Sequence, residues 1–152
     1  MVGSQAGFDH GPYAAQSNAV QAVVDMFGAA DLTDLGDSEP FMRAAVQVGL
    51  GSSTTVRRSA SPISYLGSGA DVRAGAVADR PPFLILQGTD DGNVRARHSK
   101  AFARRLQAAG VPAELVLVEG AGHGLDSSSQ RPTPGQLTRV VADFFTRHLA
   151  SE

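Results

Sequence analysis

Two short apolar runs, each closed by a turn of small residues, constrain the fold of this chain more than any other feature. Residues 81–91 read PPFLILQGTDD, and residues 116–124 read VLVEGAGHG. Apolar runs without alternation are typical of strands that are buried on both faces of a parallel sheet. The first turn ends in aspartates and the second contains His123, so each predicted strand leads into a residue capable of proton transfer.

The remaining apolar segments alternate between strand and helix patterns. Residues 19–27 are valine-rich and predict a strand buried on both sides, and residues 40–48 predict a helix with one apolar face. Strand, helix, strand, helix along a chain indicates right-handed crossovers and a parallel sheet. The predicted strands are 19–27, 83–86 and 113–118, and the predicted helices are 40–48, 98–109 and 136–149, with Phe41, Ala44, Ala45 and Val48 forming the apolar face of the first helix.

Two other stretches show no sustained period. Residues 1–18 are rich in Gly, Ser, Ala, Gln and Asn, and we expect them to form a mobile arm before a single domain at 19–152. Residues 49–80 predict a long irregular stretch, interrupted by a short turn-like piece at 61–66. Long irregular segments often cover or line sites, so a lid role for 49–80 is left open.

Composition excludes several classes of protein. A chain of 152 residues with 42% apolar and 18% charged residues is typical of one globular domain. A formal charge of −2 without a basic stripe argues against nucleic-acid and membrane partners, and the absence of cysteine excludes disulfides and a thiolate nucleophile. No segment resembles a signal peptide or a membrane span, so we expect a cytoplasmic protein, although export is equally compatible with zero cysteines.

The two turns are expected to converge. In parallel sheets, reactive residues lie in loops beyond the carboxyl ends of the strands, where Asp91 and His123 both fall. A carboxylate that accepts a hydrogen bond from one imidazole nitrogen leaves the other nitrogen free to act as a base. The alternative for residues 90–92 is ordinary turn chemistry, and for His123 it is a structural loop histidine. Glycines on both sides of His123 favour a tight turn and an accessible ring.

These residues carry a resemblance to a known family. FLILQGTDDGNV, a helix, and then ELVLVEGAGHG resemble the C-terminal half of an α/β-hydrolase, most closely the esterases related to dienelactone hydrolase and prolyl oligopeptidase. VQAVVDMFGAADL and SASPISYL are similar to earlier segments of the same esterases, so the resemblance runs from about Val20 to Leu149. It implies an α/β fold of about three parallel strands with flanking helices, and an activity that needs no cofactor or metal.

By position, the resemblance implies that Asp91 is the acid of a catalytic triad and that His123 is its base. Asp90 would then be an exposed, solvated neighbour. Two positions depart from the family pattern: Gln87 stands where histidine is common, and Arg95 stands where proline is common. Neither replaces a catalytic atom, but both are expected to alter the loop around Asp91.

The nucleophile elbow of the family, G-x-S-x-G, has no match here. Residues 3–7 have glycines at the right separation, but Gln5 is at the centre and no strand precedes it. VGSQAG resembles the end of the helix that follows the elbow. The expected fold is therefore a partial α/β-hydrolase whose N-terminal strands, elbow and oxyanion-hole donors would precede Met1.

Several serines are candidates for the missing nucleophile, and for each the alternative is loop solvation or helix capping. Ser61 and Ser64 are expected to cap a short helix, whereas Ser127–Ser129 follow His123 closely. The other histidines lack metal-like spacing: His98 is expected to open a helix and His148 to lie at a helix C-terminus. The serine candidates are Ser4, Ser52, Ser53, Ser61, Ser127, Ser128 and Ser129, of which Ser4, Ser127 and Ser128 are retained as weak ones.

The sequence thus predicts a carboxylic ester hydrolase that acts on small-molecule esters through Asp91, His123 and an unassigned serine. The alternative is a catalytically inactive hydrolase remnant that acts as a dimeric binding or structural module. Strand 19–27 would present an unpaired, apolar edge, and such edges promote association. We therefore expect a homodimer that forms through this edge.

Overall fold

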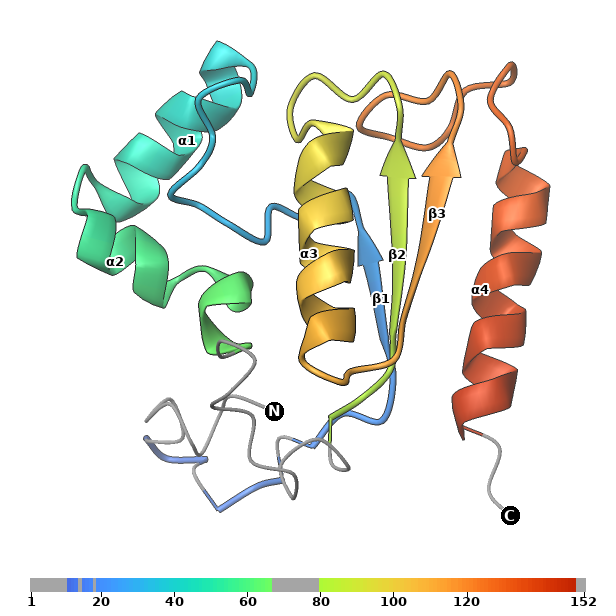
Figure 1. Cartoon of the computed structure of the whole chain (residues 1–152), viewed down its shortest axis with the longest axis horizontal. Coiled ribbons are helices and arrows are strands. Elements are labelled where there is room, and N and C mark those ends of the chain that lie inside the picture. The colour runs from blue at the N-terminus through green and yellow to red at the C-terminus, as the bar shows by residue number, and fades with distance from the viewer. Residues whose placement is uncertain (1–10, 14, 18, 67–79, 150–152) are drawn as a thin grey trace.

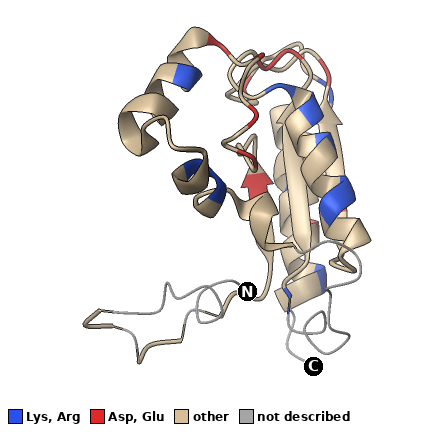
Figure 2. Ribbon diagram, turned by 60° about the vertical axis from the view of Figure 1, so that its left-hand side comes forward, with Lys and Arg blue, Asp and Glu red and all other residues tan. Residues whose placement is uncertain are grey.

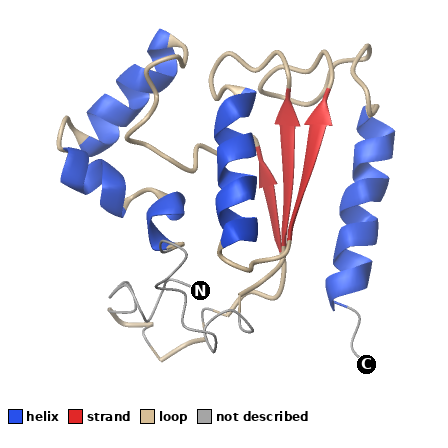
Figure 3. Ribbon diagram, viewed as in Figure 1, coloured by secondary structure: helices blue, strands red, loops and turns tan. Residues whose placement is uncertain are grey.

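The computed structural model describes residues 11–13, 15–17, 19–66 and 80–149. Its centre is a parallel sheet of three strands in the order β1-β2-β3, formed by β1 (Val23–Met26), β2 (Phe83–Gly88) and β3 (Ala113–Val118). The register aligns Met26 with Leu86 and Gly88 with Val118, so the carboxyl ends of the strands lie at the same end of the sheet (Figure 3). The predicted α/β class with three parallel strands is confirmed.

Two hydrophobic clusters, one on each face of the sheet, form the core. The helices α3 (Ala96–Ala108) and α4 (Pro134–Leu149) flank the strands on opposite sides (Figure 1). Successive side chains of a strand point to opposite faces, so Ile85 packs with Phe102 of α3. Leu84 and Leu86 pack with Phe144 of α4. Because β2 is covered on both faces and paired on both edges, its first four residues form an uninterrupted apolar run.

The first strand differs most from its prediction. Residues 19–27 were expected to form a strand buried on both sides, but β1 covers only Val23–Met26 and lies at an edge of the sheet. Val20 is 43% exposed and Met26 is 47% exposed, so the prediction of full burial is wrong. A valine-rich run specifies strand propensity, whereas burial depends on which elements cover it. Pairing of this edge with a second copy of the chain stays a prediction.

The other strands and helices lie close to their predicted positions. β3 has the predicted bounds, and β2 continues two residues beyond Leu86. α3 begins at Ala96, so His98 lies within its first turn, and the chain leaves the helix through Gly110 with a φ of 74°. Glycine at this position is a common C-terminal stop because it adopts a left-handed backbone without a Cβ clash. α4 begins at Pro134, two residues before the prediction.

Residues 40–65, which follow β1, form a helical arm beside the sheet (Figure 1). It contains α1 (Pro40–Leu50), α2 (Thr54–Ser59) and the 3₁₀ turn η1 (Pro62–Tyr65), so the prediction of an irregular 49–80 stretch is wrong for 54–59 and right about a short turn near 61–66. The apolar face predicted for α1 is exposed: Phe41 is 76% and Val48 is 88% accessible, and α1 has no buried residue.

Several predictions fall largely or wholly outside the described residues. The mobile arm at 1–18 is described only at 11–13 and 15–17, and 67–79 of the possible lid are not described. The single domain at 19–152 therefore stays a prediction. Among the described residues, no helix has both the length and the apolar character needed to cross a bilayer.

Candidate active site

The turn that follows β2 holds Asp91 in a fully buried position. Its Oδ1 accepts hydrogen bonds from the backbone N–H groups of Asn93 and Val94, both at 2.9 Å. Its Oδ2 accepts from the side chain of Gln87 at 3.0 Å and lies 2.8 Å from Nδ1 of His123. The turn interpretation of Asp91 and its pairing with His123 are therefore compatible, because each uses a different carboxylate oxygen. Asp90 is exposed, as predicted.

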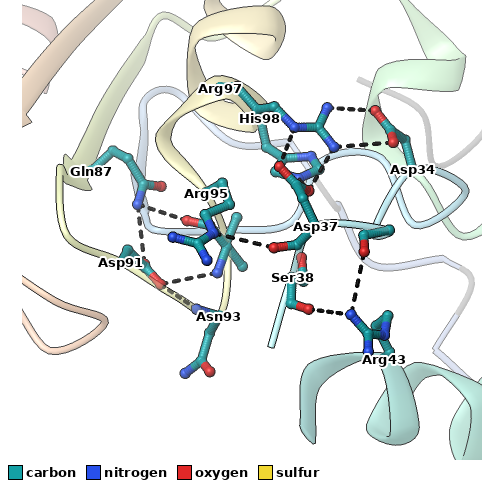
Figure 4. Close-up of polar contacts among 12 residues, drawn as sticks. Asp34, Asp37, Ser38, Arg43, Gln87, Asp91, Asn93, Arg95, Arg97 and His98 are labelled. Carbon is teal, nitrogen blue, oxygen red and sulfur yellow. Dashed lines mark hydrogen bonds and ion pairs between the residues drawn. The ribbon is translucent and has the colours of Figure 1, made fainter. Parts of the chain in front are cut away.

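Gln87 connects the turn that holds Asp91, called the acid turn below, to α3. Its Nε2 lies 3.0 Å from Oδ2 of Asp91 (Figure 4). The same Nε2 lies 3.0 Å from the carbonyl oxygen of Val94, while Oε1 of Gln87 accepts from the hydroxyl of Ser99 at 2.6 Å. All of these groups are buried, so each bond satisfies polar atoms that water cannot reach. Sequence reasoning treated Gln87 only as a departure that would alter this loop. An amide inside the apolar run FLILQG was the signal for this buried network.

His123 lies in the loop between β3 and α4. Two backbone hydrogen bonds between Glu119 and Arg131 close the base of this loop. The N–H of Glu119 donates to the carbonyl of Arg131 at 2.7 Å, and the N–H of Arg131 donates back at 3.0 Å. The left-handed backbone of the loop lies at Gly120, with a φ of 69°, and at Leu125, with a φ of 52°. The flanking glycines predicted to make the tight turn are therefore not the residues with the special backbone.

Backbone hydrogen bonds join the acid turn to the segment that leads into and includes the loop of His123, called the histidine loop below. The N–H of Asp90 donates to the carbonyl of Ala121 at 3.0 Å, and the N–H of Thr89 donates to the carbonyl of Val118 at 3.0 Å. A Cβ added at Gly88 would lie 2.3 Å from the carbonyl oxygen of Ala121. This close approach brings the imidazole of His123 over Asp91, with the histidine side chain 33% exposed. The arrangement can hold the imidazole in one tautomer, with Nδ1 as the donor to Asp91.

The sequence profile of the prolyl oligopeptidase family matches residues 11–152. The chain belongs to the prolyl oligopeptidase family. It is 37% identical over 70 residues to a probable isoprenylcysteine alpha-carbonyl methylesterase, ICMEL1, of Arabidopsis thaliana; these residues are 46% of this chain and 14% of the relative.

Solved structures show the same fold. A truncated form of a carbohydrate esterase from gut microbiota is 26% identical with a TM-score of 0.66, over 90% of this chain and 45% of that one. The thermophilic esterase Est2 of Thermogutta terrifontis is 22% identical with a TM-score of 0.58, over 84% of this chain and 42% of that one. These matches confirm the resemblance to α/β-hydrolases of the prolyl oligopeptidase and esterase type. The chain spans less than half the length of each of these relatives.

In this member of the prolyl oligopeptidase family, no serine hydroxyl among the described residues is hydrogen-bonded to His123. The hydroxyl of Ser127 instead lies 3.0 Å from that of Ser129, and Ser53 caps α2 by accepting from Val56. Ser61 directly precedes η1 but does not cap it: its Oγ accepts from the N–H of Leu32 at 2.9 Å and donates to the carbonyl of Arg57. Its predicted capping role is therefore wrong. Ser4 lies outside the described residues.

The other histidines of this family member have separate environments. His98 is buried in the first turn of α3, where its Nε2 lies 3.3 Å from Oδ1 of Asp37. His148 is in the last turn of α4, as predicted, with its ring 4.7 Å from that of Phe144. His10 lies outside the described residues. No group of three His, Cys, Asp or Glu side chains in the described part of the chain is arranged to hold a metal ion.

A charged cluster anchors the loop before α1 to the start of α3. Acidic residues gather on the loops beyond the strands, whereas α3 carries basic ones (Figure 2). Arg97 donates to Asp34 at 2.6 Å and to Asp37 at 2.6 Å, and this guanidinium lowers the pKa of both carboxyls (Figure 4). The carboxylates and the guanidinium are about half exposed, so water and salt weaken the pairs. The loop reaches the acid turn directly, where the N–H of Glu39 donates to the carbonyl of Gly92 at 2.9 Å.

The turn after β1 is built around Asp25. Its Oδ1 accepts from the N–H of Gly28 at 3.0 Å, and a Cβ at Gly28 would lie 2.3 Å from the same oxygen. Burial raises the pKa of the Asp25 carboxyl, and the bond from Gly28 offsets part of that effect. Because the folded state binds the proton more tightly than the unfolded chain does, Asp25 costs stability as the pH rises through its folded pKa.

Asp25→Asn is therefore expected to raise the melting temperature at pH 7 by about 2 °C, since the amide oxygen still accepts from Gly28 and no charge is buried. The gain should shrink as the pH falls through the folded pKa of Asp25 and disappear below about 3, where the carboxyl is protonated in both states. Calorimetry at several pH values measures the difference. Asp143→Asn, at an exposed position of α4, is the matched control. A gain that is the same at all pH values would contradict the burial argument.

A shallow groove lies elsewhere, between β3 and α4. It is lined by Leu117, Glu119, Arg131, Pro132, Gln136 and Val140. Neither Asp91 nor His123 contributes to it. The chemistry available at the ends of the strands therefore lies outside this groove.

Proposed function

We propose that the chain is a carboxylic ester hydrolase in which Asp91 orients His123 as the general base for a serine nucleophile. The observation that carries this proposal is the 2.8 Å contact between Oδ2 of the buried Asp91 and Nδ1 of His123. Membership of the prolyl oligopeptidase family supports it. The resemblance in sequence implies that members of this family carry the acid and the histidine of the triad on these same two turns.

The chemistry follows from the hydrogen bonds of the pair. With Nδ1 donating to Asp91, Nε2 is the unprotonated nitrogen and faces away from the carboxylate. Nε2 takes the proton of the serine hydroxyl as its oxygen attacks the ester carbonyl, and returns it to the leaving alcohol. Water then repeats the sequence on the acyl-enzyme. Asp91 stabilises the imidazolium in each half, while its bonds from Gln87 and the turn amides hold the carboxylate still.

The substrates proposed are small-molecule carboxylic esters. The relatives support this class, since they include a probable methylesterase, a carbohydrate esterase and a thermophilic esterase. The partial exposure of His123, at 33% of its side chain, is compatible with a reacting group that meets substrate from solvent. A cytoplasmic location and a homodimer through the free edge of β1 stay predictions.

The nucleophile stays unassigned. Ser127 and Ser128 lie in the same loop as His123, and Ser127 is held by Ser129 and by the side chain of Gln130, which accepts from its N–H at 3.0 Å. A serine that reacts must bring its hydroxyl within hydrogen-bond reach of Nε2. The identification of that serine therefore decides how the site is assembled.

A fluorophosphonate probe tests the proposal, with peptide mass spectrometry to locate the adduct. We expect one serine to be labelled, and labelling to fall strongly in Asp91→Asn. The amide no longer selects the imidazole tautomer in which Nδ1 of His123 is the donor, so Nε2 is no longer available as the base. Asp90→Asn, at the adjacent exposed position, is the matched control and should be labelled normally. A folded protein with no labelled serine, or labelling that is equal in Asp91→Asn, would contradict the esterase proposal and favour the inactive binding module.

A further inference from the structure

The ring of Phe27 packs against the imidazole of His123. The two ring centroids are 4.5 Å apart and the planes are tilted by 50°. Phe27 follows β1 directly, whereas His123 belongs to the loop after β3, so the contact spans the sheet from its edge strand to the histidine loop. Phe27 is half-buried and packs on the cluster beneath α4. The residue that directly follows β1 therefore contacts the proposed base.

The backbone of Phe27 is held in an unusual conformation. Its φ is 51°, in the left-handed region that residues with a Cβ adopt rarely. Its N–H donates to the carbonyl of Leu86 at 2.8 Å, which continues the pairing of β1 with β2, and the next N–H is captured by Asp25. These bonds on either side hold the strained turn and direct its ring.

Strain of this kind is concentrated around His123. Among the described residues, the two non-glycine positions with positive φ are Phe27 and Leu125. One contacts the imidazole and the other lies two residues beyond it, where its carbonyl accepts from the buried side chain of Gln130 at 2.9 Å. Residues held in sparsely populated backbone regions tend to cluster at functional sites, because the surrounding structure must maintain them.

One hydrogen bond is insufficient to orient an imidazole. The bond from Nδ1 to Asp91 fixes one atom, but the ring can still rock about that atom because χ2 of histidine has a broad energy minimum. A second contact on the face of the ring removes this freedom and excludes water from one side of the bond to Asp91. The ring of Phe27 provides that contact.

We propose that Phe27 is a positioning residue that holds His123 in the orientation bonded to Asp91, so that Nε2 faces the reacting ester. Its consequence for catalysis rests on the proposed function, whereas the positioning itself does not. The role requires a flat ring at this place rather than apolar bulk alone. Leucine at position 27 should therefore fail, and tyrosine should succeed.

The test of positioning needs no activity. The Nδ1–H proton of His123, bonded to a buried carboxylate, is expected to give a low-field resonance in the NMR spectrum of the purified protein. Phe27→Leu should broaden this resonance through exchange with water, and Phe27→Tyr should restore it. Phe145→Leu is the matched control, because Phe145 packs on the same cluster but its ring contact is with Phe144. Retention of the resonance in Phe27→Leu, or its loss in the control, would overturn the proposal.

The same variants separate this role from the esterase proposal. With an ester substrate, Phe27→Leu should lower kcat about tenfold while KM stays within about twofold, because a misoriented base slows the chemical step without removing binding contacts. A lost resonance with unchanged kcat would overturn the link to catalysis and leave the esterase proposal intact. If no variant hydrolyses esters and no serine is labelled, the esterase proposal fails, and the NMR result alone decides whether Phe27 positions the imidazole.

Discussion

His123→Ala is expected to hydrolyse a short-chain p-nitrophenyl ester about 10³-fold more slowly than the natural sequence, with kcat carrying most of the loss. The reason is that the variant has no group able to take the serine proton, while the remaining binding contacts persist. The loss should exceed that of any surface variant, since His123 is the described imidazole that bonds to the buried Asp91. Steady-state kinetics over a range of substrate concentrations measures kcat and KM separately.

His148→Ala is the matched control for this experiment. His148 also lies next to an aromatic ring, that of Phe144, but it is in the last turn of α4. Its removal should change kcat by less than about twofold, because no step of the proposed mechanism uses it. Circular dichroism on both variants establishes that each is folded. Equal rates for His123→Ala and the natural sequence would remove His123 from the proposed mechanism.

Gly88→Ala is expected to lower the free energy of unfolding by about 3 kcal/mol. The added Cβ would lie 2.3 Å from the carbonyl oxygen of Ala121 and 2.7 Å from that of Gly122. Both neighbours are backbone atoms, so relief requires the acid turn and the histidine loop to separate. The melting temperature should fall by about 6–12 °C for a chain of this length, and urea denaturation measures the change in free energy.

Gly122→Ala tests whether the effect of Gly88→Ala comes from the close approach. Gly122 lies in the partner loop, directly before His123, but a Cβ added there has no heavy atom within 4 Å. We expect its free energy of unfolding to stay within about 0.5 kcal/mol of the natural value. Similar losses in both variants would mean that glycine itself, rather than the contact between the two turns, is needed at these positions.

The parallel strands and the loops at their ends were predictable from local pattern. The run at 83–86 is apolar without alternation because β2 is covered by α3 on one face and by α4 on the other. Once the sheet is parallel, the turns after β2 and β3 must lie at one edge, which is where Asp91 and His123 meet. The glycine at 110 and the helical spacing before it likewise marked the end of α3.

Burial was harder to predict than secondary structure. The same kind of valine-rich run that marks a central strand occurs in β1, which lies at an edge, and the apolar stripe of α1 is exposed at Phe41 and Val48. A hydrophobic period states which face a helix would bury, but it does not state what covers that face. The α2 helix was missed because its six residues, TTVRRS, are too few to show a period.

The sequence by itself determined the α/β class, the chain order of the three strands and of α1, α3 and α4, and the two turns that carry Asp91 and His123. Those features follow from short-range periodicity and turn chemistry, which act between neighbours in the chain. Only the tertiary structure decided that Gln87 holds the acid, that Gly88 lets the two turns touch, and that Phe27 packs on His123. Each of these contacts joins residues through the three-dimensional register of the strands and the direction of a side chain, and neither is contained in a local pattern.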